Sequence, residues 1–198
     1  MEIFRTRHDP ALIAMLQEGA VGILATDTVY GLVASARHPE AVARMYGLKH
    51  RERKPGPTIA ASAQQLVELG IDPRLVSRVA HLWPNPISVI LPLPDSLQHI
   101  HQGRGGSPFR VVAERALRDM LAQTGPLVTS SANLPGQPPA TTVDEARAYF
   151  GQQVDFYVDG GDVGHRPPST IIQLDTAGRV TVLREGAIIV DKQGNIIT

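Results

Sequence analysis

Short apolar runs of strand length alternate with stretches that carry apolar residues at helical spacing along most of this 198-residue chain. The pattern begins with the pair Asp9 and Pro10, a typical helix start, and continues with an uninterrupted apolar run at 21–25. Alternation of this kind is typical of α/β proteins, in which helices cover a sheet of mixed strand direction. Because no shift of composition marks a linker and no internal repeat is visible, we expect a single α/β domain over residues 1–198.

The same patterns place the individual elements. Strands are expected at 21–25, 32–34, 59–61, 87–93, 109–112, 126–129, 154–158, 170–174, 179–184 and 187–190, the last two completing the sheet. Helices are expected at 10–18, 39–48, 63–69, 73–83, 113–122 and 143–150. The glycine-rich stretch 98–108 is expected to be the most flexible part of the chain.

Bulk composition excludes several classes of protein. The formal net charge is zero and 5% of the residues are aromatic, so no general attraction to nucleic acid is expected. The chain has no cysteine, and no apolar run approaches the roughly 20 residues of a membrane span. We therefore expect a cytoplasmic protein without membrane contact. Basic residues concentrate at 44–54 and 96–118, which suits a local anion site better than a polyanion-binding surface.

Familiar catalytic and cofactor motifs are missing from the sequence. It contains no G-x-x-x-x-G-K-[ST] phosphate loop, no G-x-G-x-x-G after a strand and no G-x-S-x-G elbow. The seven histidines show no H-E-x-x-H or comparable spacing, so no protein-bound metal is expected. Candidate functional residues must therefore be sought among polar side chains at strand ends.

The clearest such strand end is Thr26, Asp27 and Thr28, which directly follow the apolar run at 21–25. Small polar side chains at the end of a buried strand are unfavourable unless they have hydrogen-bond partners. Two interpretations stay open: a strand end that contacts a ligand, as in many α/β proteins, or a polar turn between two strands.

Cationic residues form a second group of candidates. Arg110 lies inside the apolar strand at 109–112, where an unpaired cation is unfavourable, so we expect a carboxylate partner from the protein or from a ligand. Lys49 and Arg51 stand two apart in a charged loop, where they either face one phosphate chain together or form an ordinary solvated charge run.

Three further strand ends carry polar groups. The stretch 129–133 offers hydroxyls, an amide and backbone N–H groups after a buried strand, and its alternative role is a helix N-cap. Ser169 precedes one expected strand. Arg184 closes the next one, where the alternative is a plain edge charge.

Seven short motifs in this order resemble the YrdC-type threonylcarbamoyl-AMP synthases. They are T-D-T-V-Y-G-L at 26–32, K-H-R at 49–51, W-P-N-P at 83–86, F-R-V at 109–111, T-S-S-A-N at 129–133, S-T at 169–170 and R-E-G at 184–186. The resemblance covers about residues 19–186. It implies one YrdC-like α/β domain, in which a twisted mixed sheet with flanking helices carries a large concave cavity.

In that family the reaction joins L-threonine, bicarbonate and ATP into threonylcarbamoyl-AMP and pyrophosphate, on the way to N6-threonylcarbamoyladenosine at position 37 of tRNA. The resemblance thus implies a nucleotidyltransferase that uses Mg²⁺ with its ATP, with proteins of the later transfer step and tRNA or double-stranded RNA as further partners. Two alternatives stay open. One is a YrdC-like module that binds a nucleotide or RNA without catalysis, and the other is a carbamoyl-adenylate enzyme with another acceptor.

The resemblance also implies residue roles. Catalytic positions are expected at Lys49, Arg51, Ser131 and Asn133. The threonine contacts are expected to be Thr26, Arg110, Thr129 and Ser169. The nucleotide contacts are expected to be Lys49, Arg51, Ser131, Asn133 and Arg184. Four places depart from the usual family pattern, namely Glu52, Ala61, 113–116 and Pro139, the last of which replaces a serine that can contact the nucleotide.

Overall fold

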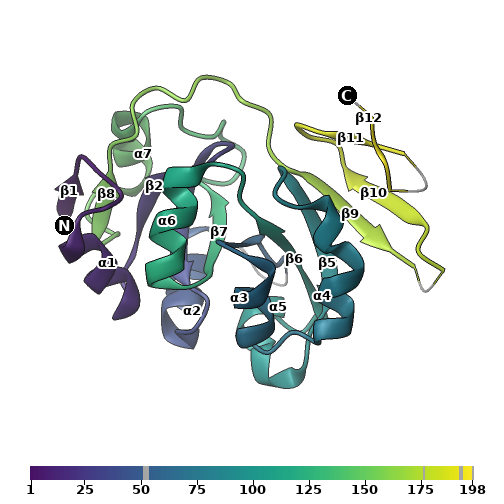
Figure 1. Cartoon of the computed structure of the whole chain (residues 1–198). Coiled ribbons are helices and arrows are strands. Elements are labelled where there is room, and N and C mark those ends of the chain that lie inside the picture. The colour runs from purple at the N-terminus through teal and green to yellow at the C-terminus, as the bar shows by residue number, and fades with distance from the viewer. Residues whose placement is uncertain (51–53, 176, 192–193, 198) are drawn as a thin grey trace.

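A ten-stranded mixed sheet runs the length of the molecule in the computed structural model, which describes residues 1–50, 54–175, 177–191 and 194–197 (Figure 1). In spatial order its strands are β1 (Glu2–Phe4), β8 (Phe156–Val158), β2 (Val21–Ala25), β3 (Tyr30–Ser35), β7 (Leu127–Ser131), β4 (Thr58–Ala60), β6 (Gly106–Val111), β5 (Ile87–Pro92), β9 (Thr170–Leu174) and β10 (Val180–Arg184). The sheet contains both parallel pairs, such as β4 with β6, and antiparallel pairs, such as β3 with β7, so the expected mixed α/β sheet is confirmed.

Helices cover both faces of this sheet. They are α1 (Pro10–Gln17), α2 (Pro39–Leu48), α3 (Ala63–Glu68), α4 (Pro73–Val79), α5 (Gln98–His101), α6 (Arg115–Thr124) and α7 (Val143–Phe150), with short 3₁₀ turns at Ala80–Leu82 and Asp95–Leu97. None of the helices in the described parts of the chain is long and apolar enough to cross a bilayer.

Strand alternation explains which helix covers which face. Leu24 of β2 packs in one buried cluster with Leu16 of α1 and Leu117 of α6. Its neighbour Ile23 belongs to another cluster, together with Met45 of α2. Because successive side chains of a strand point to opposite faces, α1 and α6 cover one face and α2 covers the other.

Local signals for helix starts are confirmed. Asp9 accepts a hydrogen bond from the N–H of Ala11 at the start of α1 (2.9 Å), and Thr142 accepts one from the N–H of Glu145 at the start of α7 (3.2 Å). Both bonds satisfy N–H groups that have no partner inside the helix, which is the physical role of an N-cap.

Two expectations about the chain are wrong. The stretch 98–108 is not a flexible loop, because it forms α5 and the start of β6. The buried His101 closes the turn between them, where its Nδ1 accepts the N–H groups of Gly103 and Gly105 (both 3.2 Å). Residues 187–190 do not complete the main sheet, because β11 (Ile189–Val190) pairs with β12 (Ile196–Ile197) in a separate two-stranded sheet.

The structure also adds two strands to the expected set, β12 in the small sheet and β1 in the main one. Residues 2–4 form β1, which pairs with β8 in parallel, Ile3 opposite Tyr157. A three-residue strand at the N-terminus carries too short a pattern to be recognised, and its partner is far away in the sequence.

Candidate active site

A cavity of about 430 Å³ lies where distant segments converge, among them the β2–β3 turn, β6, the end of β7, the start of β9 and the end of β10. Six of the sequence-predicted site residues line it, namely Thr26, Arg110, Thr129, Ser131, Ser169 and Arg184. The cavity therefore brings together all four expected threonine contacts and two of the expected nucleotide contacts.

The turn after β2 is closed by the Thr26 hydroxyl. Its Oγ1 donates to the carbonyl of Val29 (2.7 Å) and accepts from the N–H groups of Thr28 and Val29 (both 3.2 Å). Both threonines also line the cavity. The polar turn between two strands, one of the two interpretations of this stretch, is thus present. The side chains of Thr26 and Thr28 in this turn also form part of the cavity wall.

Arg110 has the carboxylate partner that its apolar surroundings predict. The partner is Asp27, whose Oδ1 accepts from Arg110 Nη1, and the two side chains are only 7% and 3% exposed, respectively. The second oxygen of Asp27 accepts from the N–H of Ala113 (3.3 Å). Arg110 Nε is buried and has no hydrogen-bond partner among the described residues, so one N–H donor of this guanidinium is left over in the cavity wall.

Lys49 joins Ser131 and Asn133, the S-x-N pair within the T-S-S-A-N motif. Its ammonium donates to the carbonyl of Ser131 (2.8 Å), to Asn133 Oδ1 (2.8 Å) and to the carbonyl of Asn133, and the lysine is only 7% exposed. Ser131 Oγ also donates to Asn133 Oδ1 (2.6 Å). Three expected catalytic residues therefore form one hydrogen-bonded network, whereas Arg51 lies outside the described residues.

This network divides the expected nucleotide contacts between two cavities. Lys49 and Asn133 line a second cavity of about 500 Å³, which shares Ser130 and Ser131 with the first. The two cavities therefore adjoin each other across the end of β7. Arg184 lines only the first.

Arg184 is bent onto the segment before β9. Its Nη2 donates to the carbonyl of Ser169 (2.7 Å) and to the hydroxyl of Ser169 (3.1 Å), and this hydroxyl also lies 2.9 Å from Ser88 Oγ. The two residues that the sequence placed at separate strand ends are thus in direct contact. The alternative of a plain edge charge does not describe Arg184.

Gly186 allows the close chain approach that this contact needs. A Cβ at this position would lie 2.2 Å from the carbonyl oxygen of Pro168 and 2.6 Å from the carbonyl carbon of Ser169. The backbone approach therefore leaves room only for glycine at this position of the R-E-G motif, since any larger residue pushes the Arg184 strand away from Ser169.

We expect Gly186→Ala to lower the free energy of unfolding by about 2 kcal/mol, because the added methyl group meets backbone atoms that cannot move independently. Urea denaturation measures this change. Gly47→Ala is the matched control, because a Cβ there has no neighbouring atom within 4 Å and the site is inside α2. A Gly186→Ala protein as stable as the Gly47→Ala protein would contradict the steric reason.

Several lining residues carried no recognised signal in the sequence. Gly164, His165 and Arg166 line the first cavity from the segment between β8 and β9. Asp27 was a candidate, but not as the partner of Arg110. The proline pair after Arg166 is the one sequence feature that suggests a stiff segment rather than a loose loop.

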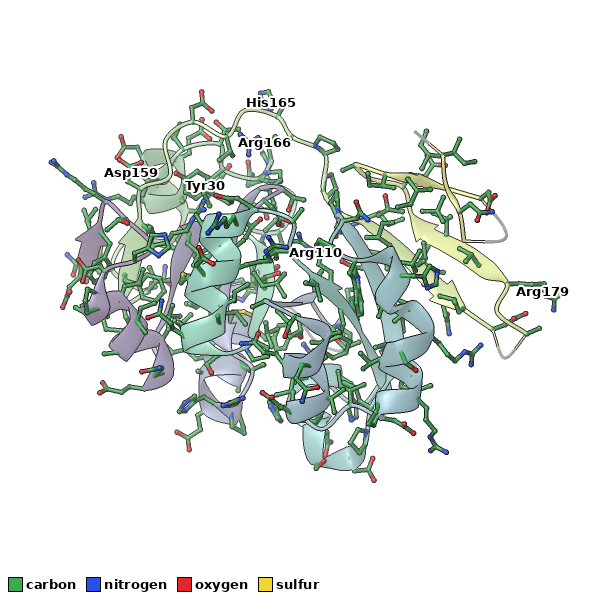
Figure 2. The ribbon with its side chains drawn as sticks, viewed as in Figure 1. Tyr30, Arg110, Asp159, His165, Arg166 and Arg179 are labelled. Atoms are coloured by element: carbon green, nitrogen blue, oxygen red, sulfur yellow. The ribbon has the colours of Figure 1, made fainter. Side chains whose placement is uncertain are left out.

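Tyr30 ties this segment to the β2–β3 turn. Its hydroxyl donates to the carbonyl of Gly161 (2.8 Å) and accepts from the N–H of Gly160 (2.9 Å). Figure 2 labels Tyr30 and, close to it, Asp159 at the start of this segment. Burial raises the pKa of Tyr30, so the phenol keeps the proton that it donates.

The first cavity is suited to anions. Its described lining includes Arg110, His165, Arg166 and Arg184 but neither Asp nor Glu. The described residues also contain no group of three or more His, Cys, Asp or Glu side chains arranged to hold a metal ion. Hydroxyls and guanidinium groups bind and orient carboxylates and phosphates, so the arrangement suits the positioning of anionic substrates.

Comparisons with known proteins show which proteins the chain is similar to. A family model named for Sua5, YciO and YrdC, with the description "Telomere recombination", matches residues 14–186. The chain is 33% identical to the threonylcarbamoyl-AMP synthase of Coxiella burnetii over 78% of its own length and 87% of that protein. It is 31% identical to the threonylcarbamoyl-AMP synthase of Vibrio campbellii over 88% of its own length and 97% of that protein.

A solved structure is similar as well. The crystal structure of Sua5 from P. abyssi in complex with L-threonine matches with a TM-score of 0.79 and 27% identity, covering 94% of this chain and 57% of that one. The chain thus spans somewhat more than half of that Sua5.

Proposed function

The chain belongs to the Sua5/YciO/YrdC family, and from its site we propose that it is an L-threonylcarbamoyladenylate synthase, a nucleotidyltransferase that makes threonylcarbamoyl-AMP and pyrophosphate from L-threonine, bicarbonate and ATP. The observation that carries the proposal is the first cavity, in which hydroxyls and arginines from distant segments meet and whose lining, among the described residues, includes no carboxylate. The adjoining network of Lys49, Ser131 and Asn133 supports it.

The proposed reaction needs no nucleophile from the protein. The threonine amine adds to CO₂ derived from bicarbonate and gives a carbamate, and a carbamate oxygen then attacks the α-phosphorus of ATP. As this P–O bond forms, the bond from the α-phosphorus to the bridging oxygen breaks, and its electron pair leaves with pyrophosphate. The protein must hold two anions next to each other, which is a task of positioning and electrostatic stabilisation.

We place threonine at the buried end of the first cavity. Arg110 supplies a buried donor there, because its Nε is left over after the ion pair with Asp27, and a substrate carboxylate suits it. Ser169 and Thr129 add side chains at 3% and 7% exposure, and Thr26, whose hydroxyl closes the turn after β2, adds part of the wall. P. abyssi Sua5, the similar structure, holds L-threonine.

We place the nucleotide along Ser131 and Arg184, toward the second cavity with Lys49 and Asn133. Arg51 belongs to the same proposal and lies outside the described residues. ATP enters as its Mg²⁺ complex, and the substrate phosphates and water supply the oxygen ligands of this ion. Lys49 both holds the S-x-N segment in shape and adds positive charge next to it.

Pyrophosphate release tests the proposed function. We expect release from ATP that requires both L-threonine and bicarbonate, with threonylcarbamoyl-AMP detected by mass spectrometry. Pyrophosphate release that does not depend on threonine would contradict the proposal and favour a carbamoyl-adenylate enzyme with another acceptor. Absence of release together with tight RNA binding would favour a non-catalytic binding module. The proposed product then passes, in the cytoplasm, to the proteins that transfer the threonylcarbamoyl group to tRNA.

A further inference from the structure

A strap crosses the first cavity between β8 and β9. We use this name for residues 162–168, which run over the top of the molecule in Figure 1. The strap is anchored at both ends: the N–H of the buried Val163 donates to the carbonyl of Thr141 (2.9 Å), and the carbonyl of Pro168 accepts from the N–H of Ala187 (2.8 Å). Just before the strap, the Tyr30 hydroxyl holds Gly160 and Gly161.

The span between these anchors has a restricted backbone. Gly164 donates its N–H to Asp162 Oδ1 (2.7 Å), and two prolines follow Arg166. A proline restricts the residue before it to extended conformations, so Pro167 limits the backbone of Arg166. The strap therefore holds Arg166 at a defined place on the cavity wall, while the side chain itself is exposed.

Arg166 differs from the other two arginines of the cavity. Arg110 is paired with Asp27, and Arg184 donates to Ser169. In the part of the chain that the structure describes, the Arg166 side chain has neither a hydrogen bond nor an ion pair. Its guanidinium thus keeps all five N–H donors for a ligand.

Burial indicates which end of the substrates Arg166 meets. Arg110 and Ser169, at the proposed threonine end, are 2% and 3% exposed, whereas Arg166 is an exposed residue at the cavity rim. Figure 2 shows the strap with Arg166 on the upper side of the cavity, above Arg110. This leaves the rim at Arg166 and Arg184 for the triphosphate of the more highly charged substrate, whose nucleoside then lies toward Ser131 and the second cavity.

We propose that Arg166 binds the β- and γ-phosphates of ATP, and pyrophosphate as it leaves. A guanidinium fits phosphate oxygens in a bidentate manner, and negative charge accumulates on pyrophosphate as its bond to the α-phosphorus breaks. Arg166 is then a catalytic residue that contacts the leaving group from the side of the cavity opposite β6. This inference rests on the proposed function for the identity of the nucleotide.

Steady-state kinetics of Arg166→Gln test the inference. We expect the KM for ATP to rise about tenfold and pyrophosphate to inhibit about tenfold more weakly, as for the loss of one charge-assisted contact, with an unchanged KM for threonine. Arg166→Lys keeps the charge without the planar fork and is expected to be intermediate. Melting temperatures should match the wild type, because the side chain is exposed.

Arg179→Gln is the matched control. It removes the same charge from an arginine whose side chain is 82% exposed, at the far end of the β9–β10 hairpin (Figure 2). We expect the KM for ATP and the inhibition constant for pyrophosphate to stay unchanged. If Arg166→Gln and the wild type have the same KM for ATP and the same inhibition constant for pyrophosphate, the inference is overturned. A change in the KM for threonine alone would overturn it too.

Calorimetry with pyrophosphate alone separates this inference from the proposed function. If the wild type binds pyrophosphate about tenfold more tightly than Arg166→Gln, the inference holds even for a protein that releases no pyrophosphate from ATP. If the wild type turns over and both proteins bind pyrophosphate equally, the proposed function stands and the role of Arg166 is wrong.

Discussion

Asp27→Ala is expected to lower the free energy of unfolding by about 3–5 kcal/mol and to abolish threonine-dependent pyrophosphate release. The substitution leaves Arg110 as a buried charge without a partner, since the two side chains are 3% and 7% exposed. It also removes the oxygen that accepts the N–H of Ala113. Both losses displace the guanidinium that we assign to the threonine carboxylate.

A double variant separates the two parts of this effect. Asp27→Ala combined with Arg110→Met removes the whole ion pair, and we expect its stability to lie closer to the wild type, because no charge stays buried alone. Its activity should still be lost, since no guanidinium remains for threonine. Urea denaturation and the pyrophosphate assay measure the two quantities.

The matched control for Asp27→Ala is Asp119→Ala. It breaks an exposed ion pair on α6, between Arg115 and Asp119 at 3.9 Å, and exposed pairs of this kind contribute little to stability. We expect wild-type activity and a far smaller loss of stability. An Asp27→Ala protein that unfolds at the same urea concentration as Asp119→Ala would contradict the importance of the buried pair.

Lys49→Ala is expected to abolish pyrophosphate release and to lower the free energy of unfolding by about 1–3 kcal/mol. The ammonium is buried and serves two acceptors at Asn133 and the carbonyl of Ser131, so its loss leaves polar groups without their donor. Activity disappears because the S-x-N segment loses its position and the adjoining nucleotide site loses a positive charge.

Ser131→Ala serves as the comparison for Lys49→Ala. It removes the 2.6 Å hydrogen bond from Ser131 Oγ to Asn133 Oδ1 but keeps the backbone carbonyl that accepts from Lys49. We expect its stability to stay near that of the wild type and its turnover to fall by less. A Lys49→Ala protein that releases pyrophosphate at the wild-type rate would refute the role of this lysine.

Local hydrogen bonds made part of the fold predictable. Asp9 caps α1 as expected and Thr142 caps α7 directly before the expected helix at 143–150, because a cap joins groups two or three residues apart and needs no distant partner. The β11–β12 pair was not predictable in this way, since strand pairing depends on where the chain turns back. The closed turn after α5 depended on the buried ring of His101, which in a glycine-rich stretch looks like any other loop residue.

The site, like the fold, has features that follow from local sequence and features that depend on distant contacts. A carboxylate for Arg110 followed from sequence, because a lone cation in an apolar strand is too unfavourable to persist. That this carboxylate is Asp27, 83 residues away, was decided by the tertiary structure alone. The separation of Lys49 and Asn133 from the first cavity and the approach of Arg166 on the strap were likewise decided by distant chain contacts.

The α/β class, the helix starts and the set of polar residues that need partners thus follow from the amino-acid sequence alone. These properties depend on the spacing of side chains within one or two turns or strands and on the free energy of burying a charge. The tertiary structure decided which of those residues meet, because such contacts depend on how segments tens of residues apart pack against one another. Asp27 with Arg110, Lys49 with Asn133 and the strap over the first cavity are of this second kind.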